Sequence, residues 1–381
     1  MPRMPRETTG SEEAASRSPR CSGRERSADE EPPESTLKIE EFTVSWQRPG
    51  VPCWENEAFK IFQRAGFVIV NDVLTDDQSE KVLKTCEDVA RQIIEIDPRG
   101  NRAKGRYSIG TAFSSGSSLH LPEFSEHLLG AGVILEPLLC KIFHKDGKAD
   151  FQCYSGGGDF VVPGVEEYQP LHGDIEMKFH DEKMPPPFVS VNFCVQPLTT
   201  WNGPIRMVPG KTRLDWDGRT EPIEWRHSRL CPVPVGAALL RDVRILHGGT
   251  PNLSNKIRFL PSVEFVSEAF QIQYPEWWPP VRCITQRTYD ALDKTVQRRC
   301  KGLVADDGAD VENVKIDFEF EQRGKEPGSL AVSLPTSEPE LPAPELLATE
   351  QDDGPTEDSR TVEEIEEKGS EASPEGRTEF F

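Results

Sequence analysis

The stretch from residue 237 to residue 266 reads AALLRDVRILHGGTPNLSNKIRFLPSVEFV. Its two apolar runs, AALLRDVRILH and KIRFLPSVEFV, flank a segment rich in Gly, Pro and Asn, which is typical of a turn between two strands. The pattern predicts two antiparallel strands, with His247 at the end of the first and Arg258 at the start of the second. We expect the turn to bring Arg258 back alongside His247.

Similar short runs precede this stretch from about residue 150 onward. Several short strands at regular spacing predict a sandwich or barrel. Residues 188–196 alternate cleanly: one face carries Ser190, Asn192 and Gln196, while the other is apolar. One side of this strand is therefore expected to face something polar. The other runs are FQCYS, DFVVP, YQPLHGD and PIRMVP.

Helical patterns flank the β-rich region on both sides. Residues 56–65 have apolar side chains at helical spacing, with Gly66 as a stop signal and a predicted strand over 67–70. Thr75 and Gln78 form a capping-box pattern before a long amphipathic helix. Two more helices are expected over 124–143, with Pro137 as a candidate kink, and over 288–299.

The two ends of the chain differ in composition from the middle. Residues 1–38 and 323–381 have few large apolar side chains and cannot bury enough surface to offset the entropy of ordering. We interpret both as disordered tails around one domain at 39–322. Of the net charge of −21, residues 323–381 carry −11 and residues 1–35 carry −2, which leaves −8 for the middle.

Charge and cysteine usage narrow the classes of function. An acidic chain is repelled by phosphate backbones, so nucleic-acid binding is disfavoured. Nine dispersed cysteines without a CxxC pair indicate reduced thiols and an intracellular protein. No apolar run is long enough to span a membrane. We expect a cytoplasmic protein; the Arg/Ser-rich start leaves organelle import as an alternative that Glu7, Glu12 and Glu13 oppose.

The segment Leu171-His172-Gly173-Asp174 places an imidazole and a carboxylate two positions apart. On an extended chain both side chains project to the same side. Alone, the pattern also fits a turn with an exposed histidine. Together with His247, however, it supplies two imidazoles and one carboxylate, the ligand set suited to Fe(II) oxygen chemistry because three metal positions stay open. A closed zinc site would want a fourth protein ligand.

The chain resembles the phytanoyl-CoA dioxygenase family of 2-oxoglutarate oxygenases over about residues 55–266. The resemblance rests on His172, Asp174, His247 and Arg258 and on four stretches that occur in the family's order. These stretches are FQRAGFVIVNDVLTDDQSEKV (62–82), PGVEEYQPLHGD (163–174), NGPIRMVPGK (202–211) and PVGAALLRD (234–242).

This resemblance implies an α+β fold with a β-rich core, a double-stranded β-helix of the jelly-roll or cupin kind with flanking N-terminal and C-terminal helices. It implies that His172, Asp174 and His247 are the iron ligands and that Arg258 pairs with the distal carboxylate of 2-oxoglutarate. Leu171 and Lys211-Thr212 depart from the residues that the family usually has there. Family members that halogenate lack the carboxylate ligand, so the intact Asp174 makes hydroxylation the expected outcome.

The expected cofactors are Fe(II), 2-oxoglutarate and O2, with ascorbate as reductant, and the expected substrate is a small molecule or a lipid-like acyl compound. Arginine suits the co-substrate's far carboxylate because its fork is rigid and always charged. Asn192 is a candidate contact to the co-substrate, although a buried asparagine bonded to backbone explains it equally well. Gln152 and Tyr154 are weaker candidates of the same kind.

Other polar residues are expected to be structural or solvated. The cluster of Arg102, Lys104 and Arg106 could meet an anionic substrate, but a solvated surface loop is the favoured interpretation. Two alternative functions stay open: a catalytically silent β-helix module that binds a metal or ligand, and a cupin-type isomerase or hydrolase. The primary substrate, the oligomeric state and any protein partners of the tails are not predicted. The remaining histidines are expected to be structural or at the surface; they are His120, His127, His144, His180 and His227.

Overall fold

The computed structural model describes residues 36–47, 53–96, 98, 100, 103–109, 117–145, 147–175, 184–212, 228–275 and 282–306. Most of both expected tails lies outside these residues, as do Arg102, His180 and His227. Residues 36–38 are described, and Leu37 is buried with its N–H donating to the carbonyl of Leu230 (2.9 Å). The packed chain therefore includes residues before position 39.

In the described part of the chain, seven strands form one large sheet. Every neighbouring pair is antiparallel except the first, which is parallel. The order across this sheet is β1 (Thr43–Ser45), β2 (Phe67–Asn71), β10 (Ala238–Asp242), β7 (Phe188–Phe193), β12 (Arg258–Ser267), β6 (Phe151–Val161) and β3 (Arg106–Ser108).

A smaller antiparallel sheet lies against the large one. Its order is β11 (Ile245–Gly249), β8 (Ile205–Thr212) and β9 (Arg229–Cys231). The segment before Asp174 extends this sheet through isolated bridges from Val165 to Asn252 and from His172 to His247. Successive strands thus alternate between two sheets, as in a double-stranded β-helix, and the predicted fold class is confirmed.

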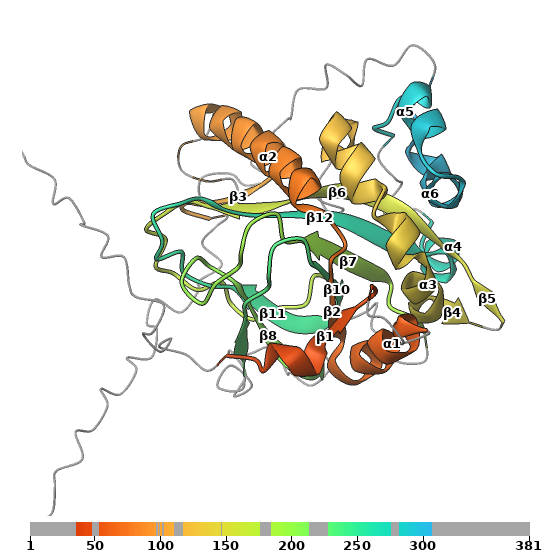
Figure 1. Cartoon of the computed structure of the whole chain (residues 1–381), viewed down its shortest axis with the longest axis horizontal. Helices are drawn as coiled ribbons and strands as arrows, with labels where there is room; N and C mark the ends of the chain where they lie inside the picture. The colour runs from red at the N-terminus through yellow and green to blue at the C-terminus, as the bar shows by residue number, and fades with distance from the viewer. Residues whose placement is uncertain are drawn as a thin grey trace, which may run out of the picture. The chain divides into compact units, whose positions relative to one another are not determined.

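Helices surround this core. Figure 1 shows α2 and α6 on one side of the large sheet, with β8 and β11 on its other side. The α-helices are α1 (Trp54–Ala65), α2 (Asp76–Ile96), α3 (Gly132–Ile142), α4 (Glu268–Gln273), α5 (Gln286–Ala291) and α6 (Lys294–Cys300). The other elements are η1 (Ile39–Phe42), η2 (Ser118–His120), the π-helix η3 (Phe124–Leu129), η7 (Lys301–Leu303) and the hairpin of β4 (His144–Lys145) and β5 (Lys148–Ala149).

Alternation along the strands of the large sheet separates two hydrophobic layers. On β12, Phe259 and Val263 pack in a cluster with Val82 and Ile93 of α2. Leu260 points the other way and packs in a cluster that includes residues of β8 and β9. Every second residue of β12, counted in either direction from Leu260, therefore faces the space between the two sheets.

The N-terminal elements form as their sequence predicts. Helix α1 is capped at its C-terminus by Gly66. The φ of Gly66 is +78°, a left-handed conformation that favours glycine, and its N–H donates to the carbonyl of Phe62. Thr75 and Gln78 form both hydrogen bonds of the capping box: Gln78 N–H to Thr75 Oγ1 (3.2 Å) and Thr75 N–H to Gln78 Oε1 (2.9 Å). These predictions are confirmed.

Several predicted boundaries are wrong. The helical run over 124–143 is divided at Gly130–Ala131, between η3 and α3, while Pro137 lies inside α3. The final helix is two short helices, because the side chain of Asp293 accepts from Thr295 N–H and starts α6 anew. The runs FQCYS and DFVVP belong to one strand, β6.

The run over 237–247 is two strands, not one. Strand β10 ends at Asp242, whose carboxylate accepts from the backbone N–H of Arg244 (2.9 Å) in a tight turn. The chain then crosses to the smaller sheet as β11, so His247 and Arg258 belong to different sheets. The predicted hairpin between them is wrong, because the turn over 250–257 carries the chain from one sheet to the other.

Candidate metal centre

His172 and His247 lie on neighbouring antiparallel segments. The His172 N–H donates to the His247 carbonyl (2.9 Å), and the His247 N–H donates to the His172 carbonyl (3.0 Å). Residues in such a directly opposed pair project their side chains to the same side. The two imidazole rings accordingly lie 4.5 Å apart, centroid to centroid.

Asp174 is held next to both imidazoles by its own backbone. Its N–H donates to the carbonyl of Val243 (2.7 Å) at the β10–β11 turn. The residue between the two candidate ligands is Gly173, where a Cβ would lie 3.1 Å from the Arg244 carbonyl oxygen. Glycine at this position therefore lets the ligand-bearing segment approach the turn closely.

One oxygen of Asp174 faces both histidines. Asp174 Oδ1 lies 3.3 Å from His247 Nε2 and 3.6 Å from His172 Nε2. The candidate ligand atoms of the three residues all lie within 4.8 Å of one another. Within the described ranges, no other group of three His, Cys, Asp or Glu side chains meets this condition.

Backbone carbonyls set the tautomer of each imidazole. His172 Nδ1 lies 2.8 Å from the Pro170 carbonyl oxygen, and His247 Nδ1 lies 2.9 Å from that of Ile245. Because a carbonyl only accepts, each Nδ1 carries the hydrogen and each Nε2 keeps its lone pair. Both lone pairs are on the nitrogens that face Asp174 Oδ1.

The protonation states of His172 and Asp174 suit the binding of a metal cation. Burial, together with the neighbouring His247, lowers the pKa of His172 to about 4, so this imidazole is neutral at neutral pH. Burial alone would raise the pKa of Asp174, but the Arg241 guanidinium holds it well below its usual range. A carboxylate beside two imidazoles is the donor set of a non-haem Fe(II) site.

The model of the phytanoyl-CoA dioxygenase family matches residues 62–260, which is more than half of the chain. The chain belongs to this family. It is therefore a non-haem iron, 2-oxoglutarate-dependent dioxygenase, and the resemblance drawn from its sequence is confirmed. The matched range contains all three residues of the His172, Asp174 and His247 cluster and also Arg258.

Several solved structures match the chain at low sequence identity. EctD from S. alaskensis, solved with 2-oxoglutarate and 5-hydroxyectoine, is 15% identical, and the match covers 65% of this chain and 86% of EctD with a TM-score of 0.42. The non-heme monooxygenase ThoJ is 16% identical, over 54% of this chain and 75% of ThoJ, with a TM-score of 0.40. The epimerase SnoN, in complex with Fe3+, alpha ketoglutarate and nogalamycin RO, is 13% identical. The match covers 57% of this chain and 85% of SnoN, with a TM-score of 0.40.

Arg258 of the dioxygenase is buried with free hydrogen-bonding capacity. The residue is 3% exposed, and among the described residues its Nε and Nη1 have no hydrogen-bond partner. Burial lowers its pKa to about 10, which leaves the guanidinium charged at neutral pH. A buried, charged, incompletely paired guanidinium is costly unless a ligand completes its hydrogen bonds, so the geometry fits an anionic co-substrate.

Asn192 lies on the same inward face of the large sheet. It is directly opposite Ser262 of β12. Ser262 is four residues after Arg258 on this strand, so both face the same side of the sheet. Asn192 is 6% exposed, and its Oδ1 has no hydrogen-bond partner in the described part of the chain.

Two charged residues of the interior were given no role on sequence grounds. Arg241 Nη1 donates to Asp174 Oδ2 (2.7 Å), and Ser190 Oγ donates to Glu264 Oε1 (2.9 Å). Both charged residues are about 5% exposed. The available signal was a charge inside an otherwise apolar strand, in AALLRD and in SVEFV.

The other residues that the sequence analysis considered lie in the packed interior or at the surface. Tyr154 packs edge-on against Phe188, with the two ring centroids 5.2 Å apart, and Gln152 is half-buried on β6. Arg106 is buried and donates to the carbonyls of Glu167 (2.6 Å) and Thr250 (2.9 Å), so the expected solvated loop is wrong for this residue. Lys104 is exposed. Of the other described histidines, His127 is buried, His120 is half-buried and His144 is exposed.

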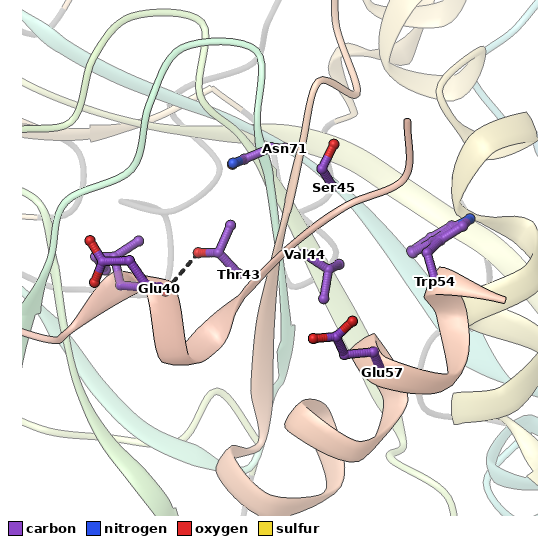
Figure 2. Close-up of a pocket in the computed structure, with 8 residues that line it drawn as sticks. Glu40, Thr43, Val44, Ser45, Trp54, Glu57 and Asn71 are labelled. Atoms are coloured by element: carbon purple, nitrogen blue, oxygen red, sulfur yellow. Dashed lines mark hydrogen bonds between the residues drawn. The ribbon is translucent and has the colours of Figure 1, made fainter. Parts of the chain in front are cut away.

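A surface pocket of about 360 Å³ lies elsewhere on the dioxygenase, between η1, β1 and α1 (Figure 2). Its lining includes Glu40, Trp54, Glu57 and Asn71 but none of the candidate ligands. Both glutamates are exposed. The described residues also contain no helix that is long and apolar enough to cross a membrane.

Proposed function

We propose that this dioxygenase holds Fe(II) with His172, Asp174 and His247 and hydroxylates a small-molecule or lipid-like substrate, with release of succinate and CO2. The observation that carries the proposal is the convergence of three ligand atoms of suitable charge within 4.8 Å of one another. Three ligands on one face of an octahedral ion leave three positions for 2-oxoglutarate and O2.

The roles of the three ligands follow from their hydrogen bonds. The carbonyls of Pro170 and Ile245 hold the imidazoles with Nε2 toward the metal position, and they make both rings better donors. Asp174 supplies the negative charge. When bound, Fe(II) couples the oxidative decarboxylation of 2-oxoglutarate by O2 to oxidation of the substrate.

Arg258 is proposed to bind the distal carboxylate of 2-oxoglutarate. Its Nε and Nη1 have no hydrogen-bond partner among the described residues, so both can donate to a carboxylate. Asn192 is proposed as a second contact. A half-turn of its side-chain amide would present the NH2 group, the end that can donate to an anion. Hydroxylation is the proposed outcome because Asp174 occupies the position that a halide would need.

Turnover without a primary substrate tests this function. Purified full-length protein is incubated with Fe(II), 2-oxoglutarate, O2 and ascorbate, which we propose as the reductant, and succinate is measured. We expect slow succinate formation that requires Fe(II) and is lost in Asp174→Ala. Iron binding without any binding of 2-oxoglutarate would contradict the proposal and favour a catalytically silent module.

The substrate is then sought in a metabolite extract. Extract incubated with the complete reaction is compared with extract that lacks 2-oxoglutarate, and masses that gain one oxygen are identified. Small-molecule or lipid-like products would support the proposed substrate class. A gain confined to polypeptides would contradict it.

A further inference from the structure

The two oxygens of Asp174 have different partners. Oδ2 accepts a hydrogen bond from Arg241 Nη1 at 2.7 Å, whereas Oδ1 faces the Nε2 atoms of His247 at 3.3 Å and His172 at 3.6 Å. The Asp174 side chain is 20% exposed and that of Arg241 is 7% exposed. A charge-assisted hydrogen bond of this length in a buried setting strongly restrains the carboxylate.

Arg241 reaches Asp174 from the large sheet. It lies on β10, all of whose residues are buried, and Asp174 is the carboxylate to which its guanidinium donates. Arg241 Nη1 is also 3.2 Å from His247 Nδ1, but that nitrogen donates to the Ile245 carbonyl and so cannot accept from Arg241. The guanidinium therefore acts on the carboxylate and not on the imidazole lone pair.

A second acidic residue, Glu264, lies in the same row of the large sheet as Arg241. Arg241 is opposite Ser190 on β7, and Ser190 is opposite Glu264 on β12, so the three residues form a row across the sheet. Because Ser190 Oγ on β7 donates to Glu264 Oε1, the Glu264 carboxyl group is bonded to the neighbouring strand. Asp174 is therefore the carboxylate in direct contact with the Arg241 guanidinium.

We propose that Arg241 is a positioning residue that keeps Asp174 a one-oxygen ligand of the metal. The inference rests on the proposed function. A carboxylate without this restraint can turn and bind a metal through both oxygens, which would occupy one of the three positions that 2-oxoglutarate and O2 need. With Oδ2 held by Arg241, only Oδ1 points at the metal position.

The experiment measures metal binding by the full-length protein without turnover. Mn(II) affinity and the visible absorption spectrum of the Co(II)-loaded protein, which reports the number of ligands, are compared for wild type, Arg241→Leu, Arg241→Gln and Arg241→Lys. The matched control is Arg299→Gln, because Arg299 of α6 forms an ion pair of similar length and burial with Glu136 of α3 (2.8 Å, side chains 18% and 15% exposed).

We expect Arg241→Leu to lose about 10-fold to 100-fold in Mn(II) affinity, as for other residues that orient a metal ligand. Arg241→Lys should be intermediate, since it keeps the charge but not the fork. The Co(II) spectra of the Leu and Gln variants should change, and Arg299→Gln should match wild type. A merely structural role would lower the thermal stability of the metal-free protein and leave both metal readouts unchanged.

Mn(II) affinity of Arg241→Leu within about twofold of wild type, with an unchanged Co(II) spectrum, would overturn the inference. If Arg241→Leu does not fold by circular dichroism, the Gln and Lys variants decide by the same criteria. Failure of wild type itself to bind Mn(II) would contradict the proposed function, whereas a defect confined to the Arg241 variants supports this inference alone.

Discussion

Gly248 lies directly against the backbone carbonyl oxygen of Gln169, so that a Cβ at position 248 would be 2.6 Å from this oxygen. The contact joins β11, which carries His247, to the segment that carries His172. Any side chain at position 248 must push these two segments apart, and with them the two imidazoles.

Gly248→Ala is therefore expected to destabilise the protein by about 1–3 kcal/mol, the usual cost of overpacking, and to weaken Mn(II) binding. Chemical denaturation and Mn(II) titration measure the two effects. Gly132→Ala is the matched control, because its Cβ would be 3.4 Å from the nearest atom, an ordinary contact, on helix α3. Equal stability and metal affinity in the Gly248 and Gly132 variants would show that the close approach is unimportant.

Replacement of Arg258 should have opposite effects on the free and the ligand-bound protein. Arg258→Met removes a buried guanidinium with unpaired nitrogens, so the unfolding temperature of the ligand-free protein should stay equal or rise. The stabilisation by 2-oxoglutarate should disappear. Arg258→Lys should raise the 2-oxoglutarate concentration for half-maximal binding about 10-fold or more, since the loss of a charged hydrogen bond is worth about 1.5–3 kcal/mol.

Thermal shift with increasing 2-oxoglutarate, in the presence of Mn(II), measures both Arg258 variants. Succinate serves as a control ligand that has a distal carboxylate but no keto acid. An Arg258→Met protein that 2-oxoglutarate stabilises as much as wild type would exclude Arg258 as the anchor.

Glu264 should make the stability of the metal-free protein depend on pH. Burial, aided by the Asp174 carboxylate and opposed by Arg241, raises the pKa of Glu264 from 4.5 to about 7. Because the folded pKa lies above the unfolded one, the contribution of the carboxyl group to stability is full below pH 4.5 and is lost as pH rises toward 7. A shift of this size corresponds to about 3 kcal/mol.

Glu264→Gln removes this titration while keeping an acceptor for Ser190. The unfolding free energy of wild type minus that of Glu264→Gln should therefore fall between pH 4.5 and pH 7 by a few kcal/mol, measured by urea unfolding in the presence of a chelator. A difference that stays constant across this range would mean that Glu264 is not buried as described.

The metal ligands themselves should be indispensable. Asp174→Ala and His247→Ala are each expected to lose Mn(II) binding and succinate formation, because two remaining ligands do not hold the ion. His120→Ala is a control, since His120 is half-buried and its imidazole bonds to the nearby Ser117 carbonyl, away from the candidate ligands. Retention of full activity by Asp174→Ala would remove the basis of the ligand assignment.

Local patterns in the sequence predicted much of the fold. The spacing of His172 and Asp174 was enough to predict a shared side, because on extended backbone residues two apart face the same way. The capping box at Thr75 predicted the start of α2, since both of its hydrogen bonds are local. The family resemblance predicted a double-stranded β-helix, and this fold class is confirmed.

The turn between β10 and β11 and the contact of Arg241 with Asp174 were not predicted from the sequence. Both depend on which of the two sheets each strand joins. The run over 237–247 contains no Gly, Pro or Asn, so its composition does not reveal the turn at Asp242 that sends His247 to the smaller sheet. Arg241 and Asp174 are 67 residues apart and meet only across the two sheets. The roles of the candidate ligands, Arg258 and Asn192 stay predictions.

Anomalous scattering from a crystal of the protein grown with Mn(II) and 2-oxoglutarate tests the central claim most directly. The account predicts a single strong peak bonded to His172 Nε2, Asp174 Oδ1 and His247 Nε2, with the distal carboxylate of 2-oxoglutarate on Arg258. A peak at another site, or 2-oxoglutarate bound away from Arg258, would contradict it.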